Sequence, residues 1–167
     1  MKKLILFALS AALLLSGCAS SEKTGNFQLY LTDQPVDADE IWATISKIEV
    51  QKTGEAFLTI WEGTKEYDLL TLMNTQELVL DTTLEEGMYT QIRLTVTEGR
   101  IVIGGQSNEM TVPSSMVQIP LVFNVMEDSS VEVVLDFEAD QSVDVIHTGQ
   151  NAEYLLKPVI RVENISY

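Results

Sequence analysis

The feature that most constrains the fold is a series of short segments in which apolar and polar residues alternate, from residue 27 almost to the end of the chain. The segment "FQLYLT" places Phe27, Leu29 and Leu31 on one face, and "SSVEVVLDFEA" separates its apolar residues from its acidic ones in the same way. A period of two is typical of β-strands with one face in a core. No regular strand–helix alternation is present, which argues against dinucleotide-binding and P-loop folds.

About eight such segments follow each other at roughly 8–12-residue spacing, which predicts a single all-β domain, either a β-sandwich or a small barrel. A change of phase after Ile45 predicts a β-bulge near Ser46-Lys47. Gly104-Gly105 predicts a hairpin turn, and Pro158 within the expected last strand predicts an edge strand or a bulge. A strand closed by a glycine is expected in "EAFLTIWEG", and helical turns only in "EYDLLTLMN" and "DQSVDVIH".

The chain is strongly acidic. It has 167 residues and a formal net charge of −15 at pH 7, with hydrophobic residues at 46%. This length suits one domain with a sizeable core, and the composition argues against a disordered chain. The charge argues against nucleic acid as a partner, because a surface this acidic repels phosphates.

The first 17 residues have the pattern of a secretory signal. A basic start at Lys2-Lys3 precedes the apolar run Leu4 to Leu15, which is too short to span a bilayer as a mature helix. The sequence Leu15-Ser16-Gly17-Cys18 matches the bacterial lipobox, a branched apolar residue and two small residues before a cysteine. The match implies cleavage before Cys18 and lipidation of that residue, which predicts a membrane partner through a lipid anchor.

Residues 18–26 are expected to form the lipidated cysteine and a short polar tether, followed by the β-sandwich domain over 27–167. The eight residues from Ala19 to Asn26 reach at most ~28 Å when fully extended, so the domain is expected to stay near the membrane. Ala19 is not the aspartate that often retains lipoproteins in the inner membrane of Gram-negative cells. The expected location is therefore the periplasmic face of the outer membrane in a Gram-negative host, and otherwise the outer face of the cell membrane. With Cys18 lipidated, no thiol remains for a disulfide, a zinc site or a nucleophile.

Several motifs within the domain resemble a known family. They are "LYLTDQP", "YDLLTL", "EEGMYTQIRLTV", "VLDFEADQSV" and "YLLKPVIRV", in this order. Together they resemble the bacterial and archaeal lipoprotein domain of unknown function 4382, and the resemblance covers nearly all of Phe27 to Val162. It implies an exported β-sandwich of immunoglobulin-like or transthyretin-like kind and brings no agreed activity. Gly87 and Tyr89 have architectural interpretations, a turn with positive φ and a corner tyrosine bonded to nearby backbone.

Two acidic segments are candidate cation sites. The loop "DQPVDADE" contains Asp33, Asp37, Asp39 and Glu40, but it lacks the glycine and terminal glutamate of an EF-hand loop. Asp136, Glu138 and Asp140 fall on one face of an extended segment. Solvated surfaces explain both segments as well, so we predict no metal and no cofactor.

The sequence contains no convincing catalytic constellation. His147 is the only histidine, and its nearness to Ser142 and Asp144 in sequence does not make a triad. A pair of carboxylates is a formal candidate for glycoside hydrolysis, but among 25 acidic residues some pair always has a suitable separation. The prediction is therefore that the protein is not an enzyme and has no catalytic residues, with an envelope hydrolase as an alternative.

Aromatic residues provide the remaining candidate site. Trp42 falls on the polar side of its strand, opposite Ile41 and Ala43, while Trp61 ends a strand and Tyr67 follows soon after. Exposed aromatic side chains on a β-sandwich stack on sugar rings or anchor protein partners, whereas covered ones belong to a core. The leading expectation is a non-enzymatic cell-envelope lipoprotein whose β-sandwich serves binding or structural interaction, with an unknown envelope protein or a glycan as its partner. Binding of a carbohydrate or another small ligand through these aromatic residues or the loops is the alternative.

Overall fold

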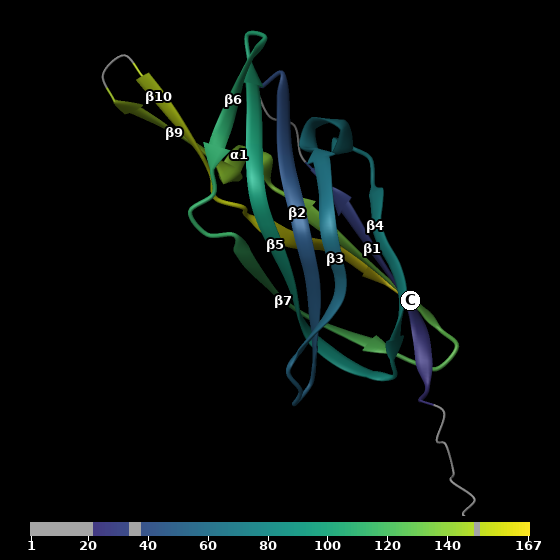
Figure 1. The fold of residues 1–167 in the computed structure, drawn as a ribbon. Coiled ribbons are helices and arrows are strands. Elements are labelled where there is room, and N and C mark those ends of the chain that lie inside the picture. The colour runs from purple at the N-terminus through teal and green to yellow at the C-terminus, as the bar shows by residue number, and fades with distance from the viewer. Residues whose placement is uncertain (1–21, 34–37, 149–150) are drawn as a thin grey trace, which may run out of the picture.

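The computed structural model describes residues 22–33, 38–148 and 151–167, and they form two β-sheets packed face to face (Figure 1). The first four strands are β1 (Thr24–Thr32), β2 (Glu40–Lys52), β3 (Phe57–Asp68) and β4 (Glu77–Glu85). They are followed by β5 (Gly87–Ile103), β6 (Gln106–Thr111), β7 (Met116–Val125) and β8 (Ser130–Phe137). The last three strands are β9 (Val143–Thr148), β10 (Asn151–Leu156) and β11 (Ile160–Ser166), with two short helices, η1 (Leu69–Leu72) and α1 (Ala139–Ser142), between strands.

The sheets are mostly antiparallel. The smaller sheet has the order β11-β8-β1-β4, and the larger has the order β3-β2-β5-β6-β10-β9, with β7 pairing to β5. In the smaller sheet β1 lies in the interior and runs parallel to β8, with Phe27 opposite Val131. The predicted all-β sandwich is confirmed, and the described residues form eleven strands, more than the eight or so expected.

The core lies between the sheets and consists of the apolar positions of the alternating strands. At its centre the Phe123 ring stacks on both Phe27 and Tyr89, with ring centroids 5.3 Å and 5.1 Å away. Each of these three side chains is at most 1% exposed. Around them pack Leu29, Leu31, Ile41, Ile45, Ile48, Val50, Ile92, Leu94, Val133, Leu135 and Phe137.

The passage from β4 to β5 carries the chain from one sheet to the other. The Tyr89 hydroxyl donates to the backbone carbonyl of Glu85, 3.0 Å away, as predicted for a corner tyrosine. Gly87 between them has a φ of +154°, and a Cβ there would lie 2.5 Å from the Lys52 Cε. Glycine therefore suits this position of the turn, because φ is positive there and the Lys52 side chain leaves no room for a Cβ.

Two further local predictions are confirmed. The pairings of β2 with both neighbours shift between Ile45 and Lys47, at the predicted bulge. Gly104 and Gly105 have φ values of +57° and +75° and connect the antiparallel strands β5 and β6. Such a pair of positive φ angles is typical of a tight two-residue hairpin.

Two expected strand boundaries were wrong. Gly63 does not close its strand, because β3 continues through a register shift to Asp68. Pro158 does not lie inside one last strand, because β10 ends at Leu156 and β11 begins at Ile160 in the other sheet. Proline has no amide hydrogen for a ladder, which suits the connection between two sheets.

The short helix η1 lies within one segment where a helical turn was predicted. The second prediction was right only in part, because α1 ends at Ser142 and the rest of "DQSVDVIH" belongs to β9. Polar side chains bond to the ends of both helices. Asp68 accepts a hydrogen bond from the Leu70 amide at the start of η1. Asp33, at the end of β1, accepts one from the Ala139 amide at the start of α1, 3.1 Å away. Ser142 donates to the Glu138 carbonyl and accepts from the Val159 amide, which joins α1 to the following crossover.

The long strands give the sandwich two distinct ends. The end at which β1 begins is here called the tether end (Figure 1). It is formed by Glu22–Thr24, Thr53–Glu55, Glu85–Met88, Met126–Ser129 and the C-terminal Tyr167. The opposite end includes η1, the β5–β6 turn and α1. Because β1 begins at Thr24, three residues of the expected tether belong to the sheet. In the part of the chain that the structure describes, no helix is long and apolar enough to cross a membrane.

Candidate functional site

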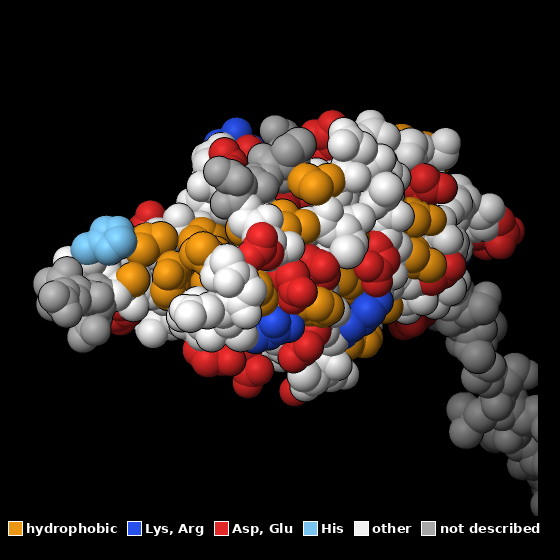
Figure 2. All heavy atoms as spheres, turned by 90° about the horizontal axis from the view of Figure 1, so that it is seen from above, with side chains coloured by type: hydrophobic (Ala, Val, Ile, Leu, Met, Phe, Trp, Pro, Cys, Tyr) orange, Lys and Arg blue, Asp and Glu red, His pale blue; other side chains and the backbone are white. Residues whose placement is uncertain are grey.

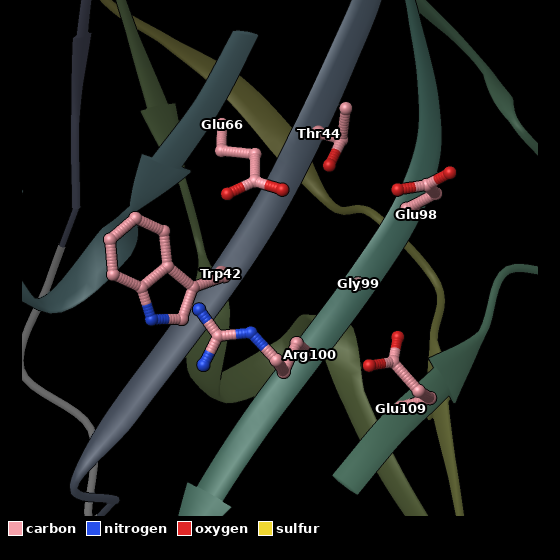
Figure 3. A pocket seen from close by; sticks show the side chains of 7 residues that line it. All are labelled: Trp42, Thr44, Glu66, Glu98, Gly99, Arg100 and Glu109. Atoms are coloured by element: carbon pink, nitrogen blue, oxygen red, sulfur yellow. The ribbon is translucent and has the colours of Figure 1, made fainter. Parts of the chain in front are cut away.

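A small pocket of about 110 Å³ opens on the outer face of the larger sheet, away from the core (Figure 3). Strand register explains its composition, because residues opposite each other on neighbouring strands share a face. Trp42 of β2 lies opposite Asp68 of β3 and Arg100 of β5, and Arg100 lies opposite Glu109 of β6. In the adjacent row Thr44 lies between Glu66 and Glu98.

The Trp42 ring is held in place by polar contacts at its edge and by a cation. Its indole Nε1–H donates to a Glu40 carboxylate oxygen, 2.7 Å away. The same carboxylate contacts an Arg100 guanidinium nitrogen at 3.5 Å, and the guanidinium carbon lies 4.9 Å from the centre of the indole. Trp42 is therefore a partly exposed aromatic side chain with a fixed orientation, and little conformational freedom remains to be lost on ligand binding.

Carboxylates dominate the surroundings of this ring. Glu66, Glu98 and Glu109 line the pocket and are exposed, and Arg100 is the only cation in its lining. Figure 2, which views the molecule from the end opposite the tether end, likewise shows more acidic than basic side chains on that surface. Together with Thr44, the pocket offers several hydrogen-bond acceptors and the donors of Arg100 beside an aromatic surface.

This arrangement is suited to binding a hydroxyl-rich or weakly cationic small ligand. Carboxylates accept hydrogen bonds from hydroxyl or ammonium groups, and indole rings stack on the apolar faces of sugars. In the described part of the chain no three His, Cys, Asp or Glu side chains are arranged to hold a metal ion.

The three aromatic candidates do not lie together. Tyr67 is 3% exposed and belongs to the core, on the opposite face of β3 from Glu66 and Asp68. Burial is the main reason that its pKa is raised above the ordinary value. Trp61 is half-buried, packs against the core and covers Gly63, where a Cβ would lie 2.9 Å from its ring. Only Trp42 contributes to the pocket.

The other sequence candidates lie elsewhere. His147 is exposed on β9, whereas Ser142 is buried with its hydroxyl bonded to backbone groups. Asp144 pairs with Lys157 at 2.6 Å, so the three residues are not arranged as a triad. Cys18 and Asp37 lie outside the described residues.

Each of the two acidic candidate segments contributes a buried carboxylate with a structural role near α1. Glu138 is 5% exposed, and one of its carboxylate oxygens lies 2.8 Å from the Arg161 guanidinium. Asp33 is 3% exposed and binds the Ala139 amide. These carboxylates join the end of β1, the start of α1 and β11.

Apart from Trp42, none of the residues lining the pocket was predicted from the sequence, and four of them are charged, namely Glu66, Glu98, Arg100 and Glu109. They come from three strands, and only the strand order places them around Trp42. The sequence of β5 alone identifies two of these residues in part, because strand alternation places Glu98 and Arg100 on the outer face, opposite buried Gly99 and Ile101.

Comparison with known proteins identifies the domain without adding an activity. No curated protein and no solved structure matches the chain. A family model described as a domain of unknown function, DUF4382, matches residues 24–158, from the first residue of β1 to the crossover before β11. This match covers most of the chain, and the protein belongs to the DUF4382 family.

Proposed function

We propose that the protein is a lipid-anchored cell-envelope protein whose β-sandwich binds a ligand and catalyses no reaction. The lipobox sequence ending at Cys18 supports the anchor. The pocket around Trp42 supports ligand binding, because it combines a fixed aromatic ring with exposed hydrogen-bonding groups. The fixed orientation of the Trp42 ring is the observation that carries the binding role.

The placement of the pocket fits an anchored protein. Lys52, at the end of β2, pairs with Glu85 at the tether end, and Trp42 lies ten residues earlier on the same strand. At about 3.3 Å per residue, this places Trp42 roughly 33 Å from the tether end along β2. A ligand from the surrounding envelope can therefore approach the pocket without contacting the membrane.

A glycan is the ligand class that this chemistry favours. The indole of Trp42 offers an apolar surface for a sugar ring, while Glu66, Glu98 and Glu109 accept hydrogen bonds from hydroxyl groups. Anionic sugars are disfavoured by the same carboxylates, so the proposal is restricted to neutral or amino-containing oligosaccharides.

The anchor is tested by replacing its attachment site. Cys18→Ala should release the protein from the membrane fraction, because a single soluble domain without acyl chains has no stable hold on a bilayer. The replacement Ser20→Ala, two residues further on, is the matched control and should leave the protein in the membranes. Sedimentation of the Cys18→Ala protein with the membranes would show that lipidation is not the anchor.

Ligand binding is tested with the indole as its own reporter. The chain has two tryptophans, so Trp61→Phe leaves Trp42 as the single emitter. Titration with neutral and amino-containing oligosaccharides should shift and quench its emission, and Arg100→Gln should weaken binding because it loosens the ring. A protein that also cleaves these oligosaccharides would instead support the hydrolase alternative. An unchanged spectrum with every oligosaccharide would refute glycan binding at Trp42.

A further inference from the structure

A second hollow, of about 560 Å³, lies at the tether end and is bordered by exposed apolar side chains. Its lining includes Gly87, Met88, Asn124, Met126 and Tyr167. Met88 is 43% exposed, Met126 is 52% exposed and Tyr167 is 68% exposed. Methionine side chains adapt their shape to a partner, and tyrosine combines an apolar ring with a polar hydroxyl. Three such exposed side chains around one hollow form an apolar patch, which is unusual on the surface of an acidic protein.

Backbone contacts place this surface beside the start of β1. The Glu86 amide donates to the Lys23 carbonyl at 2.7 Å, and Gly87 pairs with Val125 across β5 and β7. The Lys23 ammonium also lies 2.9 Å from a Glu127 carboxylate oxygen, next to Met126. The apolar hollow and the point where the chain enters the domain are therefore parts of one surface.

The proposed anchor is too close to this surface for the domain to move far from the membrane. Lys23 is the fifth residue after Cys18, and five residues of fully extended chain reach about 18 Å. We infer that Met88, Met126 and Tyr167 dock on the lipid bilayer, so that the domain stands on the membrane with its tether end downward. This inference rests on the proposed anchor at Cys18, but it adds a direct contact between the folded domain and lipid.

The charges around the hollow specify the kind of lipid. The tether end carries six carboxylates and two lysines. The carboxylates are those of Glu22, Glu55, Glu85, Glu86, Glu127 and Asp128, and the lysines are Lys23 and Lys52. Both lysines are engaged, Lys23 with Glu86 and Glu127 and Lys52 with Glu55 and Glu85. The remaining negative charge repels anionic headgroups, so docking should favour zwitterionic lipid.

The experiment uses the mature chain purified from membranes and reconstituted into phosphatidylcholine vesicles. Asn124→Cys places one thiol in the lining of the hollow and leaves the three apolar side chains intact. Ile103→Cys is the matched control, because Ile103 is 44% exposed beside the β5–β6 turn at the opposite end. Both thiols are labelled with a maleimide dye, and its quenching by lipids with brominated acyl chains is measured.

We expect severalfold stronger quenching at position 124 than at position 103. Met88→Glu together with Met126→Glu should reduce the quenching at position 124 severalfold, since both side chains are exposed and their replacement spares the core. Anionic lipid should also reduce it, and high salt should reverse that reduction. Equal quenching at the two positions, or no effect of the glutamates, would overturn the docking surface.

A separate result tests the anchor on which the inference depends. Lipidated Cys18 has no free thiol, so the unmodified mature chain should take up no maleimide dye. Labelling of that chain would overturn the anchor and the docking together. An unlabelled chain with no preferential quenching at position 124 would overturn the docking alone.

Discussion

The hydroxyl of Tyr89 donates a hydrogen bond to the backbone carbonyl of Glu85, 3.0 Å away, at the point where the chain passes from the smaller sheet to the larger one. The Tyr89 ring meanwhile stacks on Phe123 in the core, with the two planes 11° apart. One side chain thus fixes the geometry of the crossover and fills the space between the sheets. Its two roles can be separated experimentally.

Tyr89→Phe removes the hydrogen bond and keeps the ring. We expect it to lower the free energy of unfolding by about 1 kcal/mol, the usual net contribution of one such bond. Urea denaturation followed by circular dichroism measures this change. Tyr30→Phe, at a half-buried position on β1, is the control and should change stability by less than about 0.5 kcal/mol. Equal effects of the two replacements would contradict the corner role of Tyr89.

Ionisation of the Tyr89 hydroxyl is expected to make the free energy of unfolding depend on pH in the alkaline range. Burial raises the pKa of its hydroxyl above the ordinary value, and the pKa of Tyr67 is raised for the same main reason. In the unfolded chain tyrosines ionise near pH ~10. The stabilising effect of a raised pKa is fully present below that pH and is lost as pH rises through the folded-state value.

The melting temperature should therefore be insensitive to tyrosine ionisation below pH ~9 and should fall above pH ~10. Tyr89→Phe should make this alkaline decrease shallower, because it removes one of the two tyrosines whose pKa is raised. Thermal unfolding measured in steps of pH tests the slope. An alkaline decrease of the same steepness in the variant would show that Tyr89 does not contribute.

The contact between Arg161 and Glu138 joins an exposed cation to a buried carboxylate. The Glu138 side chain is 6% exposed and that of Arg161 is 62% exposed. Arg161→Gln should destabilise the protein by about 1–2 kcal/mol, less than for a fully buried pair because water reaches the arginine. Lys157→Gln breaks a pair that is exposed on both sides and should cost less than about 0.5 kcal/mol. Chemical denaturation of both variants tests the difference, and a larger loss for Lys157→Gln would contradict it.

Trp42 and Tyr67 lie on opposite faces of the same sheet, so their truncation should have different consequences. Tyr67→Ala leaves a cavity in the core and should cost about 3 kcal/mol or more. Trp42→Ala removes a partly exposed ring and should cost about 1 kcal/mol, mainly through its contacts with Glu40 and Arg100. Urea denaturation of both proteins measures the order, and the reverse order would place Trp42 in the structural core.

Local sequence patterns were sufficient to predict much of the fold. Alternation identified β1, β5 and β8, and the phase change identified the bulge between Ile45 and Lys47. These features depend on neighbouring residues alone, through side-chain direction and backbone preference. The boundary errors at Gly63 and Pro158 arose where tertiary pairing, which local patterns do not record, continued or ended a strand.

The pocket could be predicted only in part, because its residues belong together through strand order. Trp42 was recognisable as an aromatic residue on a polar face. Glu66 of β3 and Glu109 of β6 become neighbours of Trp42 only through the strand order β3-β2-β5-β6. That arrangement is determined by packing of the whole sandwich, so no single segment specifies it.

The parallel pairing of β1 with β8 constrains the timing of folding. The first strand of the domain lies between β4 and β8, and its partner Val131 follows Phe27 by more than a hundred residues. A polypeptide that emerges amino end first, from a ribosome or a translocation channel, must hold β1 without its second neighbour until most of the chain has appeared. Such late closure makes completion of the smaller sheet one of the last steps in the assembly of the sandwich, whatever the order in which the other strands pair.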